Sequence, residues 1–248
     1  MPKFSVITPV NLWSPERVDK FLKTIKSVED QTFRDFEWVI IDDGSTLEFL
    51  WDKYIISNYK ISKVNLVRKV HAERVVAYNT AFQVAEGDWF VFLDSDDELP
   101  PHALERWNKI IEKNPKYKMF NCGAIYEHKD GITTTRDPFM PKKLKVGHEI
   151  FGGGNIVNGT FIFHKSVYKD LGGFPGDETG WLLDIDCSAL NYGIDQPRNL
   201  YMGTPFDFSA MYQIKFPELR QFFMVDHVNE PNKIIKELGN PWGQDFAL

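Results

Sequence analysis

The sequence predicts a single α/β domain in which helices flank a mixed, mostly parallel central sheet. Two observations support this prediction. Short β-branched or aromatic runs alternate with segments of helical periodicity, which is the pattern of consecutive βαβ units. The 248 residues are 43% apolar and 15% aromatic, so the chain has enough apolar material for one large core.

The N-terminal segment predicts the first βαβ unit. Residues 4–10 form a β-branched run that is typical of a buried strand. Ser14 and Pro15 suit the N-cap and the first turn of a helix, and apolar residues then recur every three or four positions up to Val28. A second apolar run, residues 36–41, follows this helix, so the two strands are expected to be parallel neighbours.

The next segment repeats this plan. Residues 63–67 predict a short strand, and residues 74–85 predict a helix that ends before Gly87. The wholly apolar run at 89–93 predicts a central strand that is covered on both faces. A further helix is predicted at 103–113.

Beyond residue 115 the patterns are weaker. The elements expected there are a strand at 119–126, a hairpin or loop at 127–145, a strand at 159–163, helices at 166–171 and 182–192, and a C-terminal helical extension at 216–248.

The composition limits the classes of binding partner and the cellular compartment that we expect for this protein. A formal net charge of −6 gives no general attraction to phosphates, so a nucleic-acid partner is disfavoured, although a local basic patch leaves it open. Two cysteines allow at most one disulfide, which fits a reducing compartment. No apolar run reaches the roughly 20 residues that a membrane helix needs, and the first residues lack the apolar core of a signal peptide. We therefore expect a cytoplasmic protein without an integral membrane segment.

Polar residues follow three of the predicted strands, at residues 9–11, 42–45 and 94–97. Because ligands of open parallel sheets bind beyond the carboxyl ends of the strands, these clusters are expected to share one binding edge. Acidic side chains gathered there repel one another unless a cation or hydrogen-bond donors compensate. A divalent metal ion is the simplest compensation.

Asp94 and Asp96 are the candidate metal ligands. In an extended segment residues two apart point the same way, so both carboxylates can face one ion. Their hard oxygens suit Mg²⁺ or Mn²⁺, which would neutralise a diphosphate leaving group. The alternative is a polar loop whose aspartates cap the helix that starts near Pro100. Residues 42–45 likewise have two interpretations, as carboxylates that bind a base or ribose or as ordinary turn residues.

Four ordered segments resemble family 2 glycosyltransferases with the GT-A fold. They are residues 5–11, 27–32, 36–46 and 85–97, which read SVITPVN, SVEDQT, FEWVIIDDGST and AEGDWFVFLDSDD. The resemblance is dense over residues 3–115 and thinner afterwards. It implies that residues 1–115 bind the nucleotide sugar and that residues 116–215 supply the acceptor site and the catalytic base, ahead of the extension at 216–248.

The resemblance also implies a role for each matching position. The nucleotide-sugar contacts that it implies are Pro9, Val10, Asn11, Asp42, Asp43, Arg74, Asn79, Asp94 and Ser95. Asp94 and Asp96 match the family's DxD motif and would hold Mn²⁺ or Mg²⁺, with Asp96 as the direct ligand. His227 is a further candidate metal ligand, and a packed or surface histidine is the alternative interpretation.

The catalytic base is where this sequence departs from the family's pattern. Family members mostly invert the anomeric centre, which requires a base to deprotonate the acceptor hydroxyl. The family places an acidic pair in the helix after a Gly-Gly-Phe segment, here residues 172–174. Asp184 aligns with the usual base and Asp186 follows it, although Leu183 replaces the first acid of the pair. Asp177 is a further candidate, and helix capping is the structural alternative for Asp184.

These expectations combine into a metal-dependent, inverting glycosyltransferase. It would move a sugar from a nucleoside-diphosphate sugar, expected to be a UDP-sugar, to an acceptor glycan or another hydroxyl-bearing acceptor. A sugar nucleotidyltransferase is the enzymatic alternative, but residues 11–15 lack the glycine-rich, basic loop that would hold a triphosphate. A non-catalytic nucleotide-sugar-binding module is the third interpretation, and it applies if the base is absent.

Overall fold

The computed structural model describes residues 1–56, 61, 63–72, 74–128, 131–136, 161–171, 223–225 and 234–238. The elements in chain order are β1 (Phe4–Val10), α1 (Pro15–Glu29), β2 (Phe36–Asp43), the π-helix η1 (Asp52–Ile56), β3 (Val64–Lys69), α2 (Arg74–Val84), β4 (Trp89–Phe92), β5 (Asp97–Glu98), α3 (Ala103–Lys113), β6 (Met119–Asn121), β7 (Ala124–His128), β8 (Thr133–Arg136), β9 (Phe161–His164), α5 (Lys165–Leu171), β10 (Phe223–Val225) and β11 (Ile234–Leu238). Among the helices described, none is both long and apolar enough to cross a membrane.

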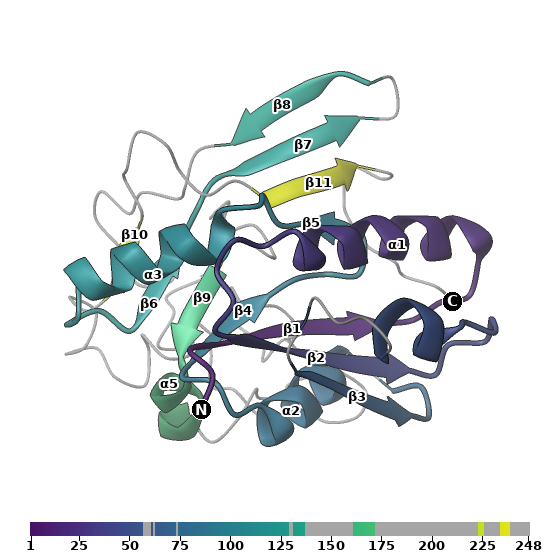
Figure 1. Ribbon diagram of the computed structural model, residues 1–248, viewed down its shortest axis with the longest axis horizontal. Helices are drawn as coiled ribbons and strands as arrows, with labels where there is room; N and C mark the ends of the chain where they lie inside the picture. The colour runs from purple at the N-terminus through teal and green to yellow at the C-terminus, as the bar shows by residue number, and fades with distance from the viewer. Residues whose placement is uncertain are drawn as a thin grey trace, which may run out of the picture.

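The helices cover both faces of a central sheet. α1 and α3 cover one face, and α2 and α5 cover the other (Figure 1). Apolar side chains of each pair of helices pack on the face that the pair covers. A smaller sheet, in the strand order β5-β11-β7-β8, adjoins α1 through β5 (Figure 1). The predicted α/β class, with helices flanking the sheet, is therefore confirmed.

Within the described residues the central sheet has seven strands, in the order β10-β6-β9-β4-β1-β2-β3. β9 is antiparallel to both of its neighbours, and every other adjacent pair of strands is parallel. This confirms the mixed, mostly parallel sheet. In its middle, β4, β1 and β2 are neighbours, and Val10 of β1 is in register with Asp42 of β2. The carboxyl ends of these three strands therefore meet at one edge.

α1 begins where the sequence predicts. Ser14 is the N-cap, and its Oγ accepts a hydrogen bond from the backbone N–H of Arg17 at 3.4 Å. Such a bond satisfies one of the N–H groups that a helix start leaves without a partner. Phe21, Ile25 and Val28 are buried against the sheet because residues three or four apart share one helix face.

The opposite face of the sheet carries a second apolar core. Alternation along the strands brings Ile7, Val39 and Phe92 to this face. There they pack with Tyr78 and Phe82 of α2, both of which are buried. Every residue of β4 is buried, as expected for a strand that is covered on both sides.

The region after α3 differs from the sequence prediction. The expected single strand at 119–126 is wrong, because β6 belongs to the central sheet and β7 to the smaller one. Cys122 and Gly123 separate the two strands, and an apolar run cannot show that its second half pairs elsewhere. In the segment expected to be a hairpin or loop, β8 pairs antiparallel with β7.

The segment 216–248, expected to be a helical extension, contains strands where the structure describes it. β10 is parallel to β6, and β11 pairs with both β5 and β7. The helical prediction is wrong at these two segments, because pairing with strands distant in sequence overrides local propensity. The helix expected at 182–192 lies outside the described residues.

Candidate functional site

Three predicted clusters of polar residues follow neighbouring strands. Asn11 follows β1, Asp42 and Asp43 end β2, and residues 94–97 follow β4. The pairing of β4, β1 and β2 brings these clusters to the same edge, and the backbone N–H of Leu93 still bonds to the carbonyl of Ile7 at 3.0 Å. The structure therefore gathers the amide and acidic groups where ligands of parallel sheets bind.

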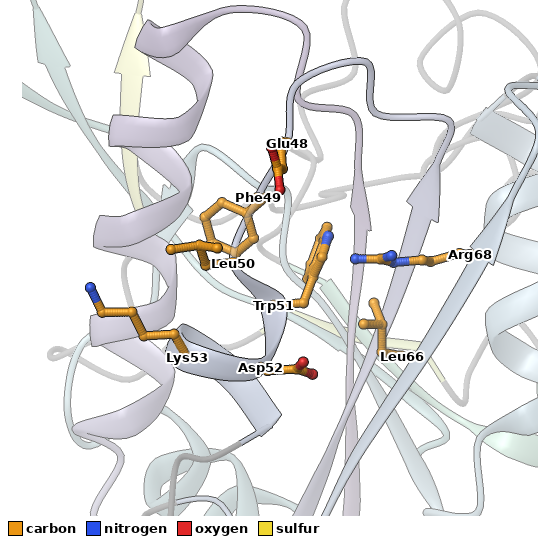
Figure 2. A pocket seen from close by; sticks show the side chains of 8 residues that line it. All are labelled: Glu48, Phe49, Leu50, Trp51, Asp52, Lys53, Leu66 and Arg68. Atoms are coloured by element: carbon orange, nitrogen blue, oxygen red, sulfur yellow. The ribbon is translucent and has the colours of Figure 1, made fainter.

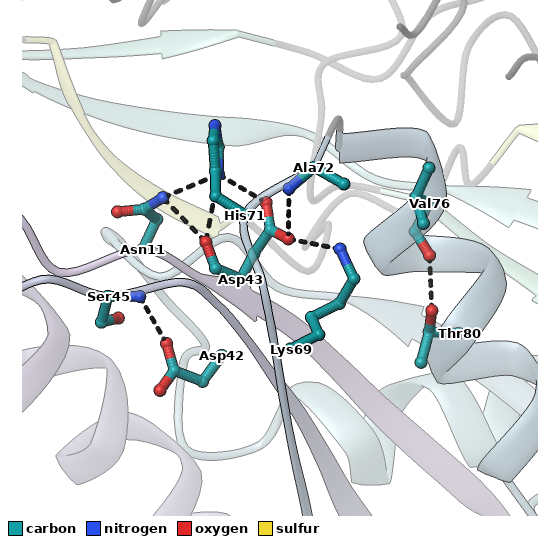
Figure 3. A network of polar contacts seen from close by, with 9 residues as sticks. All are labelled: Asn11, Asp42, Asp43, Ser45, Lys69, His71, Ala72, Val76 and Thr80. Atoms are coloured by element: carbon teal, nitrogen blue, oxygen red, sulfur yellow. Dashed lines mark hydrogen bonds and ion pairs between the residues drawn. The ribbon is translucent and has the colours of Figure 1, made fainter. Parts of the chain in front are cut away.

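Asp43 is the centre of a polar network (Figure 3). Its Oδ1 pairs with Lys69 Nζ at 2.5 Å and accepts a hydrogen bond from the backbone N–H of Ala72 at 3.0 Å. Its Oδ2 lies 3.0 Å from His71 Nδ1, and its carbonyl oxygen accepts from Asn11 Nδ2 at 2.9 Å. Asp43 is only 6% exposed, so these donors offset the cost of burying its charge. The carboxylate thereby ties the ends of β2 and β3 to the start of α2.

Asp42 points to the opposite face of the sheet, because neighbouring strand residues alternate. Its Oδ1 accepts a hydrogen bond from the backbone N–H of Ser45 at 3.0 Å (Figure 3). The Ser45 hydroxyl in turn accepts from the N–H of Leu12 at 2.8 Å. Asp42 therefore holds the turn after β2 against the segment after β1, and its Oδ2 lies 3.7 Å from Arg68 Nε.

Asp94 and Asp96 differ in their surroundings. Asp94 Oδ1 accepts a hydrogen bond from the hydroxyl of Tyr78 at 3.1 Å. Asp96 is half-buried, and within the part of the chain that the structure describes it forms no hydrogen bond or ion pair. The backbone between them is anchored by Thr24 of α1, whose Oγ1 donates to the carbonyl of Ser95 at 3.0 Å.

The alternative interpretation of these aspartates, as caps of the next helix, is wrong. α3 begins at Ala103 and its N-cap is His102, which makes no side-chain capping bond. Gln31 organises this start of the helix instead, since its Oε1 accepts from the N–H of Leu104 at 3.2 Å and its Nε2 donates to the carbonyl of Pro100 at 2.9 Å. The carboxylates of Asp94 and Asp96 are therefore not needed for helix capping.

The expected extended segment at residues 94–96 is wrong, because residues 95 and 96 form a turn that is closed by a hydrogen bond from the backbone N–H of Asp97 to the carbonyl of Asp94 at 3.1 Å. The carboxylate chemistry of residues 94 and 96 still fits a divalent metal ion that is completed by substrate. Carboxylate oxygens are the ligands that Mg²⁺ and Mn²⁺ prefer. No group of three His, Cys, Asp or Glu side chains gathers among the described residues. Mg²⁺ is usually bound by one or two carboxylates together with substrate phosphates, so two aspartates are a sufficient protein contribution.

A pocket of 520 Å³ lies on the α1 face of β3 (Figure 2), and Arg68, which lines it, is the residue near Asp42 Oδ2. Its lining residues are Glu48, Phe49, Leu50, Trp51, Asp52, Lys53, Leu66 and Arg68. The guanidinium of Arg68 lies over the indole of Trp51, with 5.3 Å from Cζ to the ring centroid (Figure 2). The predicted metal ligands Asp94 and Asp96 do not line this pocket, and the Tyr78 hydroxyl that Asp94 binds comes from α2.

The remaining predicted site residues have varied positions. Pro9 is half-buried in β1, and the side chain of Val10 is 1% exposed in the apolar core. Arg74 begins α2, and Asn79 is half-buried on the same helix. The predicted base residues Asp184, Asp186 and Asp177, and the candidate ligand His227, lie outside the described residues.

The structure adds partners that the sequence patterns did not indicate. Lys69, His71 and Ala72 bind Asp43, Tyr78 binds Asp94, and Thr24 holds the backbone at Ser95. The only sequence signal for any of them is the short polar segment between the third predicted strand and the next helix.

Gly44 keeps the network around Asp43 together. Its φ is +75°, and a Cβ built there would lie 2.6 Å from the backbone nitrogen of His71. We expect Gly44→Ala to lower the free energy of unfolding by about 3 kcal/mol, because it adds this overlap to the cost of a left-handed backbone. Gly131, with φ +79° and nothing within 4 Å of its Cβ position, is the matched control, and Gly131→Ala should lose about 1 kcal/mol. Urea denaturation measures the free energy of unfolding of both variants. Equal losses of stability would show that the backbone at His71 shifts away from the added methyl group without an energetic penalty.

The fold and the edge together define the class of protein. A mostly parallel sheet with amide and acidic side chains at the carboxyl ends of its central strands is typical of α/β proteins that bind nucleotides. The chain belongs to glycosyl transferase family 2, whose family model matches residues 16–172. The family predicted from the four sequence segments is thereby confirmed.

Curated relatives include named glycosyltransferases. EpsE of Bacillus subtilis is 26% identical over 187 residues, covering 75% of this chain and 65% of EpsE. The Escherichia coli UDP-Glc:alpha-D-GlcNAc-diphosphoundecaprenol beta-1,3-glucosyltransferase WfaP is 35% identical over 158 residues, covering 63% of this chain and 60% of WfaP. The Staphylococcus aureus poly(ribitol-phosphate) beta-N-acetylglucosaminyltransferase TarP is 34% identical over 176 residues, covering 68% of this chain and 46% of TarP. The chain thus spans 65% or less of the length of these relatives.

A solved structure has the same fold. Residues 1–349 of S. aureus TarS superpose with a TM-score of 0.61 at 19% identity, covering 95% of this chain and 60% of the TarS chain. This likeness confirms the GT-A fold class that the sequence predicts.

Proposed function

We propose that this chain is a glycosyltransferase that moves a sugar from a nucleoside-diphosphate sugar, a UDP-sugar, to the hydroxyl of an acceptor glycan or another hydroxyl-bearing acceptor. The observation that supports this most is the meeting of Asn11, Asp43 and Asp94 at the carboxyl edge of three neighbouring strands. Family membership supports the same activity. The name of WfaP gives UDP-Glc as its donor, and TarS has been solved with UDP and with UDP-GlcNAc.

In this proposal different residues at the carboxyl edge of the sheet bind different parts of the nucleotide-sugar donor. Asn11 and the Asp43 network would hold the base and ribose, because they present amide, imidazole and carboxylate groups within hydrogen-bond reach of one another. Asp94 and Asp96 would hold Mn²⁺ or Mg²⁺, which when bound neutralises negative charge on the diphosphate. Asp96, which forms no bond within the described residues, is available for such a role.

The proposed transfer inverts the anomeric centre in one displacement. It needs a carboxylate that takes the proton of the acceptor hydroxyl as that oxygen attacks C1 of the sugar. The bond between C1 and the diphosphate oxygen breaks in the same step, and UDP leaves. We propose Asp184 or Asp186 for this base, with Asp177 as the rival.

The deciding experiment is calorimetric titration of the purified chain with UDP, with and without Mn²⁺, followed by measurement of UDP release from UDP-sugars. Metal-dependent UDP binding and release of UDP support the proposal. Binding without UDP release would favour a non-catalytic module. Release of pyrophosphate from a nucleoside triphosphate and a sugar phosphate would favour a nucleotidyltransferase.

A further inference from the structure

We propose that Tyr78 positions Asp94 for binding of the metal and the diphosphate. The hydroxyl of Tyr78 donates to Asp94 Oδ1 at 3.1 Å. This inference rests on the proposed function, since it concerns the same edge. Tyr78 acts through Asp94, so it is a positioning residue and not a catalytic one.

The ring of Tyr78 is held firmly in the core. Tyr78 is 0% exposed, and its ring stacks on Phe82 with centroids 6.2 Å apart. Phe92 meets the same ring edge-on at 5.1 Å. Phe92 is the last residue of β4, two positions before Asp94. Because packed aromatic rings leave little freedom, the hydroxyl is fixed relative to the strand end that carries Asp94.

The helix that carries Tyr78 is also fixed at its other end. Asp43 Oδ1 accepts a hydrogen bond from the N–H of Ala72, two residues before α2 begins, and pairs with Lys69 Nζ. α2 therefore lies between the two carboxylates. Asp43 binds the segment just before the helix, and Asp94 binds the hydroxyl of Tyr78 on the helix. The helix sets the spacing between the proposed nucleoside and diphosphate ends of the donor site.

The hydrogen bond to Asp94 has a chemical consequence. A donor on Oδ1 restrains rotation of the carboxylate and keeps Oδ2 in a defined direction. Hydrogen bonds of this kind to metal-binding side chains typically change metal affinity by 10- to 100-fold. Asp96, without a partner among the described residues, is the adaptable member of the pair. One fixed carboxylate and one adaptable carboxylate can accept an ion that arrives together with the diphosphate.

Tyr78→Phe tests this inference, because it removes the hydroxyl and keeps the ring that the core requires. We expect the affinity of the UDP-bound protein for Mn²⁺ to fall by about 10-fold in calorimetry, with kcat reduced by a similar factor. Binding of uridine, which has no diphosphate, should be unchanged. Tyr168→Phe is the matched control, because Tyr168 packs on the same Phe82 ring, at 4.7 Å, from α5. Tyr168→Phe should keep the wild-type affinity for Mn²⁺, the wild-type kcat and the wild-type binding of uridine.

The outcomes separate this inference from the proposed function. Weaker Mn²⁺ binding with unchanged uridine binding supports positioning by Tyr78. Unchanged Mn²⁺ affinity and kcat in Tyr78→Phe, while the unaltered chain binds UDP and Mn²⁺, overturns the inference alone. Equal loss of uridine and Mn²⁺ binding would indicate a structural role only and also overturns it. Failure of the unaltered chain to bind UDP overturns the proposed function and this inference with it.

Discussion

Asp96→Asn is expected to lower kcat for sugar transfer by about 10³-fold, the scale of effect that follows loss of charge stabilisation in a transition state. Asp96 is half-buried and has no hydrogen bond or ion pair within the described residues, so the amide breaks no polar contact among them. It removes one negative charge and one hard oxygen ligand from the proposed metal site. The free energy of unfolding should therefore stay unchanged while turnover and Mn²⁺-dependent UDP binding are lost.

Asp88→Asn is the matched control for this prediction. Asp88 lies just before β4, at the end of the strand opposite to Asp94 and Asp96. Lys165 Nζ is 2.7 Å from Asp88 Oδ1, and this hydrogen bond holds the pKa of Asp88 below its ordinary value. Both variants change the net charge by one unit, so only a local role of Asp96 gives different kinetics. The measurement is kcat of Asp96→Asn and of Asp88→Asn under saturating Mn²⁺. Full activity of Asp96→Asn would contradict the proposed metal site.

The position of the candidate site could be predicted because it depends on local patterns. The polar residues Asn11, Asp42 and Asp94 each follow an apolar run, and βαβ connections make the neighbouring strands parallel. Parallel strands present their carboxyl ends on one edge, so no knowledge of side-chain contacts is needed to bring these residues together.

The partners of these residues could not be predicted, because they depend on register and on packing across the sheet. Asp43 meets Lys69 only because β2 and β3 pair in that register, and a slip of one residue would place the lysine on the other face. Tyr78 lies among apolar residues of a helix and is expected in the core, yet its hydroxyl reaches a carboxylate 16 positions away. A periodicity of apolar residues does not show where a polar atom on a buried ring will find its acceptor.

The amino end of the sheet contains a buried carboxylate that joins three of the recognised sequence segments. Glu37 of β2 is 0% exposed. Its Oε1 accepts hydrogen bonds from the Ser5 hydroxyl at 2.6 Å and from the N–H of Gly87 at 3.1 Å. Its Oε2 accepts from Asn65 Nδ2 at 2.9 Å. The segments at 5–11, 36–46 and 85–97 thus contact one another through Glu37, at the end of the sheet opposite to the edge where Asp42 and Asp94 lie.

Glu37→Ala should lower the free energy of unfolding by about 3–5 kcal/mol, because it leaves several buried donors without an acceptor. The Ser5 hydroxyl and the N–H of Glu86 lose their carboxylate acceptor, whereas the N–H of Gly87 keeps Ser5 Oγ as an acceptor at 2.9 Å. The place is closely packed, since a Cβ on Gly87 would lie 2.5 Å from Ser5 Oγ. Urea denaturation with an unchanged m-value measures the loss.

Glu86→Gln is the control for Glu37→Ala. Lys63 Nζ lies 3.4 Å from Glu37 Oε2 and also pairs with Glu86, whose side chain is 55% exposed. An exposed ion pair contributes little to stability, so this variant should unfold close to the wild-type midpoint. The contrast separates satisfaction of buried donors from attraction between Lys63 and the carboxylates. If the two variants lost equal stability, the charge of Lys63 would be the cause. If Glu37→Ala lost almost none, water would have to replace the carboxylate at the Ser5 hydroxyl and at the N–H of Glu86.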